Sequence, residues 1–317
     1  MSASASSTTH PSLPSSASDD ATFERSLSDE RKRIHTLLDR ALPAPDLIPQ
    51  ELHRAMRHSV LNGGKRLRAI LVLAVADAIK GRSKKSDDAA CAVELVHAYS
   101  LVHDDLPSMD DDDLRRGVPT CHRVFGEANA LLAGDTLQSL AFEVLAREEH
   151  PANGEMVRTL ARAIGSTGMG GGQAIDLAAV EKTMRLSDLE DMHERKTGAL
   201  IRACVRLGAL SVGIVDNIGG EGSKILAALD RYARCTGLAF QIRDDVLDIE
   251  GDTDTLGKHR GMDVALNKPT YPALIGIDAS RAKAHELHDR ALAEIESWGP
   301  AFDSLRRIAG FIVNRRY

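Results

Sequence analysis

The chain has 317 residues, 43% of them hydrophobic, and a formal net charge of −6. This length allows one large domain or two ordinary ones, and the negative charge argues against nucleic-acid binding through bulk electrostatics, so an anionic ligand would need local positive charge or bridging cations. Aromatic residues make up only 3%, so the core must be built from Ala, Leu, Val and Ile, and its Ala and Leu content favours helices over sheets.

The amino-terminal segment differs from the rest of the chain. Residues 1–22 are rich in Ser, Ala, Pro and Thr and lack the basic start and apolar centre of a secretory signal, so we expect a disordered tail. From residue 23 to residue 317 the hydrophobic pattern has helical periodicity and no Pro/Gly-rich linker interrupts it. This predicts a single all-α domain of about ten helices, over residues 21–42, 48–62, 65–81, 87–106, 119–147, 154–180, 187–215, 221–250, 270–297 and 301–317.

Several familiar kinds of site are disfavoured. The longest apolar runs, such as "AILVLAVADAI", are too short or too interrupted by charge to span a bilayer. The four cysteines form no C-x-x-C pair, which indicates buried, reduced thiols of a cytoplasmic protein rather than zinc ligands. The glycine-rich "GSTGMGGGQAIDL" lacks G-x-G-x-x-G spacing and a preceding strand. It predicts a helix with close backbone packing, not a nucleotide-binding loop.

A basic segment, "GGKRLR", opens the third expected helix at residues 63–68. Lys65 and Arg68 lie about one turn apart, and helix amino termini attract phosphates through their free N–H groups and dipole. The spacing is not that of a Walker loop. Each basic residue near the motifs below is, alone, typical of a solvated surface, but together they would form a metal-free anion site; the further ones are Arg115, Arg116, Lys196, Lys258 and Lys268.

The first acidic cluster, "DDLPSMD", follows a largely apolar helix. Asp104 and Asp110 are six residues apart, so on an unbroken helix they would point about 120° apart and would not converge. Pro107 cannot continue a regular helix and disfavours the helical region at Leu106. A helix that ends near Leu106 would let the chain return Asp110 toward Asp104, although a solvated acidic loop is an equally simple interpretation of this cluster alone.

The second acidic cluster, "DDVLD", lies in the apolar stretch "GLAFQIRDDVLDIEG". Asp244 and Asp248 are four residues apart, so on a helix their Cβ atoms would lie about 6 Å from each other on one face. Like charges at this spacing destabilise a helix, and a divalent cation that bridges them removes this cost. Hard oxygen ligands favour Mg²⁺, which commonly bridges carboxylates to phosphate. A surface acidic turn paired with Arg243 is the alternative for this cluster alone.

Taken together, these motifs resemble those of the trans-isoprenyl diphosphate synthases, most closely the short-chain, farnesyl-forming bacterial members. The resemblance rests on "NGGKRLR", "HAYSLVHDDLPSMDDDDLRRG" with "PTCH", "ERKTGALI" and "GLAFQIRDDVLDIEGDTDTLGK", in order between residues 62 and 272. It implies about ten helices around a large central cavity, usually in a homodimer. It also implies Mg²⁺, three ions per site with Mn²⁺ as a substitute, and isopentenyl, dimethylallyl and geranyl diphosphates as substrates.

The resemblance also implies roles for individual residues. The two aspartate motifs would hold the metal ions on the allylic diphosphate: Asp104, Asp105, Asp110, Asp244, Asp245 and Asp248. Further contacts to that diphosphate would come from Arg115, Lys196 and Lys258. The isopentenyl diphosphate site would consist of Lys65, Arg68, His97 and Arg116. Thr197 and Gln241 would face the developing carbocation, and Lys268 would close the site.

Two residues upstream of the first cluster are expected to set product length. Side chains on a helix tilt toward its amino end, so residues about one turn before Asp104 would shape the cavity floor. The resemblance favours Tyr99 as a floor that stops growth at fifteen carbons, with the small Ser100 leaving room beyond ten. A geranylgeranyl or geranyl diphosphate synthase is the main alternative. A terpene cyclase or a non-catalytic subunit is disfavoured, because both aspartate motifs and "GGKRLR" are intact.

Overall fold

The computed structural model describes residues 17–180, 182, 184–215, 220–250 and 268–315. Most of them are helical and the described strands comprise only four residues, so the predicted all-α class is confirmed. The long helices are α1 (Ala17–Ala41), α2 (Gln50–Leu61), α3 (Leu67–Ile79), α4 (Lys84–Asp104), α6 (Glu127–Ala146), α7 (Asn153–Ile164), α8 (Met169–Ala179), α10 (Ala199–Ser211), α11 (Glu221–Glu250), α15 (Ile277–Ile295) and α16 (Asp303–Asn314). The short ones are α5 (Cys121–Phe125), α9 (Leu186–His193), the π-helix η1 (Glu194–Gly198), α14 (Tyr271–Ile275), η2 (Glu296–Trp298) and η3 (Pro300–Phe302).

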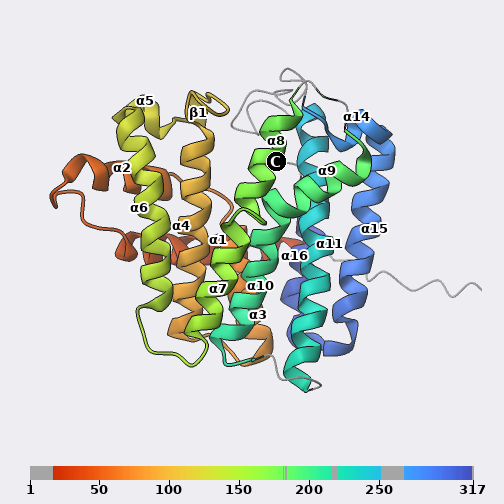
Figure 1. Cartoon of the computed structure of the whole chain (residues 1–317). Helices are drawn as coiled ribbons and strands as arrows, with labels where there is room; N and C mark the ends of the chain where they lie inside the picture. The colour runs from red at the N-terminus through yellow and green to blue at the C-terminus, as the bar shows by residue number, and fades with distance from the viewer. Residues whose placement is uncertain (1–16, 181, 183, 216–219, 251–267, 316–317) are drawn as a thin grey trace, which may run out of the picture.

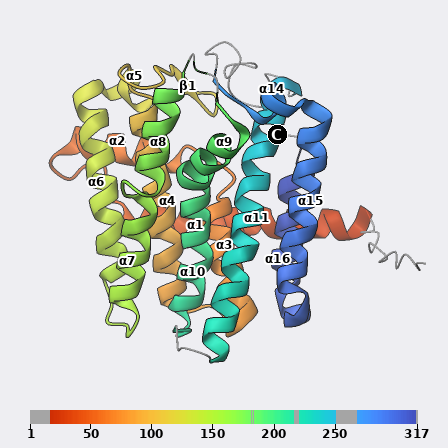
Figure 2. The same cartoon turned by 45° about the vertical axis from the view of Figure 1, so that its right-hand side comes forward.

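The long helices form a bundle around an aliphatic core. The most extensive contacts join α11 to α15, α4 to α6 and α3 to α10. Helices α3 and α4 are buried on most faces, as their apolar sequences predict. Figures 1 and 2 show α4, α6, α7, α10, α11 and α15 running roughly alongside one another, with α1 lying across them. No helix in the described ranges has the length and apolar character that crossing a membrane requires.

Three of the predicted helices are divided at glycines. The stretch 154–180 is α7 and α8, with Gly165 and Gly168 at the break. In the other two the dividing glycine has a positive φ. The stretch 119–147 was expected as one helix but is α5 and α6, separated at Gly126 with φ of 80°. Likewise 270–297 is α14 and α15, separated at Gly276 with φ of 85°. A positive φ ends the helical hydrogen-bond ladder and costs glycine little.

The first helix begins earlier in the chain than predicted. Helix α1 begins at Ala17, so the predicted disordered tail of residues 1–22 is wrong for its last six residues. The last proline before α1 is Pro14, and nothing between residues 17 and 22 breaks a helix. Residues 1–16 lie outside the described residues, and for them disorder stays a prediction.

The structure also contains a hairpin that the sequence did not predict. Strands β1 (Leu114–Arg115) and β2 (Val118–Pro119) pair antiparallel, with Arg115 opposite Val118. Arg116 and Gly117 form the turn with φ of 57° and 78°. Positive φ at both central positions is the geometry that suits a two-residue hairpin loop. This turn points Arg115 and Arg116 in different directions, which matters for the site.

Candidate active site

The carboxyl ends of α4 and α11 lie at the same end of the bundle, which also holds the hairpin, α8, α9 and α14 (Figure 1). At the first cluster α4 ends at Asp104, and the backbone N–H of Asp110 donates to the Asp104 carbonyl at 2.9 Å. The N–H of Met109 closes the turn onto the Leu106 carbonyl at 2.8 Å. The predicted return of the chain after Pro107 is therefore confirmed, and Asp104 and Asp110 lie close together.

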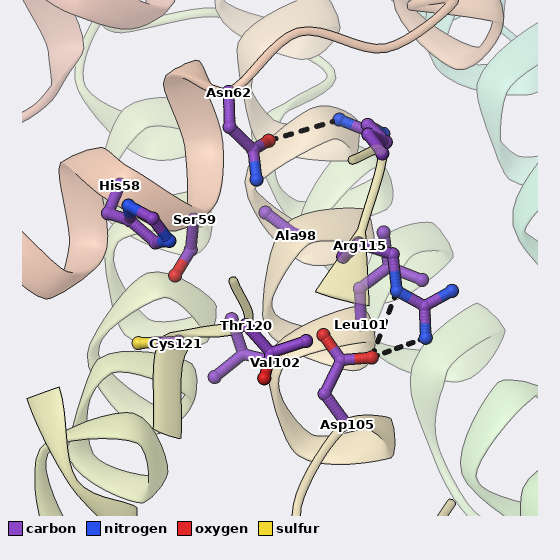
Figure 3. A pocket seen from close by; sticks show the side chains of 11 residues that line it. His58, Ser59, Asn62, Ala98, Leu101, Val102, Asp105, Arg115, Thr120 and Cys121 are labelled. Carbon is purple, nitrogen blue, oxygen red and sulfur yellow. Dashed lines mark hydrogen bonds and ion pairs between the residues drawn. The ribbon is translucent and has the colours of Figure 1, made fainter. Parts of the chain in front are cut away.

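The hairpin supplies a cation to the first cluster. Arg115 Nε donates to Asp105 Oδ1 at 2.9 Å, and Arg115 Nη2 contacts Asp112 Oδ2 at 2.8 Å. Figure 3 shows this pair beside a small cavity of about 20 Å³ that is also lined by Thr120 and Cys121. Cys121 is a free, buried thiol, as are the other three cysteines, which confirms that prediction. Arg115 thus holds Asp105 from the side of the hairpin.

The second cluster lies near the end of α11, where Asp244 and Asp248 are four residues apart on one helix, as predicted. Asp244 Oδ1 accepts from Arg315 Nη2 at 2.6 Å. The neighbouring Asp245 is buried and accepts from the backbone N–H of Tyr271 at 3.0 Å and from Gln241 Nε2 at 3.3 Å. This cluster is therefore fixed by groups from α11, from α14 and from the end of the described chain.

Thr197 and Gln241 are brought together beside the second cluster. Thr197 lies on η1, and its hydroxyl donates to Gln241 Oε1 at 3.0 Å. Gln241 in turn donates to Asp245, so a chain of hydrogen bonds joins η1 to the metal-ligand candidates of α11. These hydrogen bonds orient both side chains that were predicted to face the reacting carbon.

Two lysines link the acidic groups across the site. Lys268 Nζ lies 3.1 Å from Asp110 Oδ1 and 3.9 Å from Asp176 Oδ2. Lys196 Nζ lies 2.5 Å from the same oxygen of Asp176. Asp176 is buried on α8, and it was missed in the sequence. The sequence feature that could have indicated Asp176 is that it is the one charged residue of a glycine-rich helix.

Close backbone packing places that carboxylate. A Cβ at Gly172 would lie 2.2 Å from the backbone nitrogen of Lys196, so only glycine allows α8 to touch η1. The prediction of a closely packed helix at this glycine-rich stretch is therefore confirmed. Since Asp176 is one helical turn after Gly172, the same contact brings its carboxylate to the Lys196 ammonium.

Burial disfavours the charged form of the carboxylates in the first cluster. It raises the pKa of Asp104 to about 6, with the negative charges of Asp110 and Asp105 adding to the effect and nearby lysine and arginine opposing it. Burial also raises the pKa of Asp105, against the lowering effect of Arg115. Carboxylates in such surroundings are stabilised in their charged form by an added cation.

The donor set fits a hard divalent cation. The candidate ligands are all carboxylates, and Mg²⁺ prefers oxygen donors. Within the part of the chain that is described, no three His, Cys, Asp or Glu side chains already converge on one point. Instead Asp105, Asp110 and Asp244 each contact a basic side chain, so positive charge already compensates these carboxylates.

The residues of the predicted second anion site come from the segment before and at the start of α3, from α4 and from the hairpin. Burial and the charge of Arg315 lower the pKa of Lys65 to about 8, with further lowering from Arg116. Burial and the charges of Arg68 and Arg116 hold the pKa of His97 well below its usual value. The charge of Arg116 lowers both pKa values and that of Arg68 lowers the pKa of His97, which supports a grouping of these basic residues.

A buried ion pair shapes this group. Arg66 has a left-handed backbone with φ of 52°, and its guanidinium contacts Glu94 at 3.2 Å. Glu94 also accepts from the backbone N–H of Ala69 at 3.1 Å. Arg66 therefore points into the core, and the charge of Glu94 also acts on Arg68. Glu94 was missed in the sequence, where it is one charged residue within an apolar helix.

The remaining predicted residues lie on α4 or outside the described chain. Tyr99 is buried and packs edge-on against His103, with ring centroids 5.9 Å apart. Ser100 is half-buried and donates to the carbonyl of His97 at 3.0 Å. Lys258 lies outside the described residues, and the predicted large central cavity stays a prediction.

Comparison with known proteins agrees with this geometry. Residues 49–297 match the family model described as polyprenyl synthetase. The chain is 50% identical over 268 residues to farnesyl diphosphate synthase of Escherichia coli, covering 82% of this chain and 88% of that protein. A crystal structure of a geranyltransferase from Helicobacter pylori, complexed with magnesium and isoprenyl diphosphate, is 30% identical with a TM-score of 0.80 and covers 96% and 98% of the two chains. Geranylgeranyl pyrophosphate synthetase from Pyrococcus horikoshii is 32% identical with a TM-score of 0.81, covering 93% and 99%.

Proposed function

The chain belongs to the polyprenyl synthetase family, and we propose that it condenses isopentenyl diphosphate with dimethylallyl and then geranyl diphosphate to give (2E,6E)-farnesyl diphosphate. The observation that carries this proposal is the presence of two differently charged groups of side chains, one acidic and one basic. One is built from carboxylates bridged by lysines, around Asp110 and Asp176. The other is built mainly from cations, around Lys65 and Arg116, and it borders Asp244 of the second aspartate motif. The allylic diphosphate is released in the proposed reaction, whereas the diphosphate of isopentenyl diphosphate stays on the product. The two groups therefore need separate binding sites.

The allylic diphosphate would bind at the carboxylates. Mg²⁺ held there by the six aspartates of the two motifs would neutralise the diphosphate and make it a better leaving group. Lys196 and Lys268 would move their charge from Asp176 to the diphosphate oxygens, since both ammonium groups already lie at this end of the site. Arg115, which reaches the site through Asp105, would add a further positive charge. Preorganised charge contributes most to a step in which charge develops.

The condensation itself needs little from the protein except positioning. The oxygens of Thr197 and Gln241, fixed to each other at 3.0 Å, would stabilise the allylic cation. Isopentenyl diphosphate at the cationic site would present its double bond to that cation. A proton would then pass to the released diphosphate, so that no dedicated protein base is required. Water must be excluded during this step, because it would quench the cation.

The cationic site gives a prediction for substrate affinity. Lys65→Ala or Arg68→Ala should raise KM for isopentenyl diphosphate roughly 10- to 100-fold, because each removes one charge-assisted contact of about 1.5–3 kcal/mol. KM for the allylic substrate should change much less. Steady-state kinetics with each substrate varied in turn measures both values. Arg40→Ala, on an exposed position of α1, is the control and should change neither KM. Equal effects on both substrates would contradict the assignment.

The lowered pKa of Lys65 predicts a pH dependence. The free enzyme carries a charged Lys65 only below about pH 8, so kcat/KM for isopentenyl diphosphate should fall as pH rises through that value. Lys65→Arg should move this fall to higher pH, because a guanidinium stays charged in proteins. The pH profile of kcat/KM, measured for both proteins with the allylic substrate saturating, tests this. Identical profiles would show that Lys65 does not control the fall.

Product length gives a further prediction. Tyr99→Ala should enlarge the cavity and shift the product toward twenty carbons, whereas Ser100→Phe should fill it and favour ten. The buried position of Tyr99 on α4, five residues before Asp104, supports its role as the floor. Chromatography of the dephosphorylated products distinguishes the three lengths. Unchanged products from both variants would show that these two residues do not set the product length. A twenty-carbon product of the native chain is the second candidate, which the similarity to the Pyrococcus horikoshii enzyme supports.

A homodimer is also part of the proposal. Val124 on α5 and Leu131 and Leu132 on α6 are 48%, 49% and 51% exposed. Three large apolar side chains near one another on adjacent helices favour a partner surface, and a second copy of the chain is the partner that we propose. The solution mass by light scattering tests this against the monomer mass of 34.2 kDa.

A further inference from the structure

A cavity with a basic lining lies between α1 and the loop that precedes α3. Its volume is about 410 Å³, which is in the usual range for a small-molecule site. Helix α1 contributes Arg31, Lys32, His35 and Thr36, and the loop contributes Gly63, Gly64 and Arg66. None of these lining residues is acidic. In a chain with a net charge of −6, a cavity lined by basic groups favours an anionic ligand.

Arg31 has a donor that the protein does not satisfy. Its Nε is buried and has no hydrogen-bond partner in the described part of the chain. A buried donor without an acceptor costs free energy, and most such groups in native structures are satisfied. The two other cations in the cavity are differently placed. Arg66 is engaged with buried Glu94, and Lys32 pairs with Asp29 on the open surface, where such a pair contributes little.

The glycine pair brings a further cation to the wall of the cavity. Gly63 and Gly64 have φ of 93° and 108°. A Cβ at Gly64 would lie 2.5 Å from the Arg116 guanidinium carbon, so glycine is what allows that guanidinium to reach the loop. The charges of Arg31 and Arg116 both lower the pKa of Lys65, which places Arg31 near the cationic site. An anion in the cavity would therefore face Arg31 with Arg116 close behind Gly64.

We propose that this cavity is a second binding site for a diphosphate group, adjacent to the cationic site but entered from the side of α1. Guanidinium groups match phosphate oxygens with paired hydrogen bonds, and the guanidinium of Arg31, which lines the cavity, would contact the anion. His35 and Lys32 would contact the outer oxygens. The choice of diphosphate among polyanions rests on the proposed function. Binding itself depends only on the basic side chains that line the cavity.

The test is a calorimetric titration of the full chain with inorganic diphosphate in the presence of a metal chelator. Without metal, the carboxylate site does not bind the anion, so the native protein should bind two equivalents, one at the cationic site and one in the cavity. Arg31→Ala should bind one, or bind the second roughly 10- to 100-fold more weakly, because it loses a charge-assisted contact. Arg68→Ala should lose the other equivalent.

Two further variants keep the test decisive. Arg31→Lys restores the charge without the guanidinium and should recover part of the affinity, while Arg40→Ala on the same helix should titrate like the native chain. Melting temperatures establish that each variant is folded. A single equivalent on the native protein, or the same titration for Arg31→Ala and Arg40→Ala, would overturn the proposal. Failure of condensation activity would leave these titrations unchanged, so the two proposals fail separately.

Discussion

Asp104→Asn and Asp244→Asn should each lower turnover by more than 100-fold at saturating substrates and Mg²⁺. Losses of residues that only support a metal ligand cost roughly 10- to 100-fold, and a direct ligand should cost more. Asparagine keeps the size and the oxygen of the side chain but removes its charge. For Asp244, the hydrogen bond from Arg315 at 2.6 Å can persist, so the change tests charge rather than folding.

A matched control exists on the same helix. Asp230 lies on α11 and pairs with Arg202 at 2.7 Å, well away from the cluster in sequence. Asp230→Asn should leave turnover within about twofold of native, because surface ion pairs contribute little. Rapid-mixing or steady-state product formation measures all three variants. Near-native turnover of either folded Asp104 or Asp244 variant would contradict the metal-clamp role of these clusters.

Asp176→Asn should have the second-largest effect. Asp176 is the buried counter-ion of Lys196 at 2.5 Å and lies 3.9 Å from Lys268, so its loss leaves two ammonium groups competing for Asp110. We expect kcat/KM for the allylic substrate to fall roughly 10- to 100-fold, as for other groups that hold a contact residue in place. KM for isopentenyl diphosphate should stay nearly constant, since the cationic site lies elsewhere.

The comparison of the two substrates separates positioning from folding. A variant that is merely destabilised should lose activity toward both substrates together and should melt earlier. Asp191→Asn is the control, because Asp191 pairs with Arg195 at 2.8 Å on the exposed face of the adjacent helix. Equal losses for both substrates in Asp176→Asn, or no loss, would show that Asp176 does not position the lysines.

Local sequence rules predicted the parts of the site that lie within one segment. Pro107 ends α4, so the return of Asp110 to Asp104 could be inferred from its backbone restrictions alone. The position of Asp244 and Asp248 on the same face of a helix follows from the helical period. Both are properties of fewer than ten consecutive residues, and both appear in the structure as predicted.

Contacts between distant segments could not be inferred in the same way. Asp176 reaches Lys268 and Arg315 reaches Asp244 only through tertiary packing, in which α8 and α11 both contact η1 and α16 contacts α11. The hairpin depends on a left-handed Arg116, a conformation that arginine adopts rarely and that no local motif announces. The break at Gly126 is similar, since a glycine within a helical pattern is compatible with either outcome.

Product analysis of the native protein tests the central claim most directly. The purified chain is incubated with Mg²⁺, isopentenyl diphosphate and dimethylallyl diphosphate, and the products are dephosphorylated and separated by chromatography. Our account predicts farnesol as the main product, with geraniol as a transient species that disappears when isopentenyl diphosphate is in excess, and no product when the metal is chelated. A cyclic hydrocarbon, the absence of any condensation product, or the same yield in the presence of the chelator would contradict it.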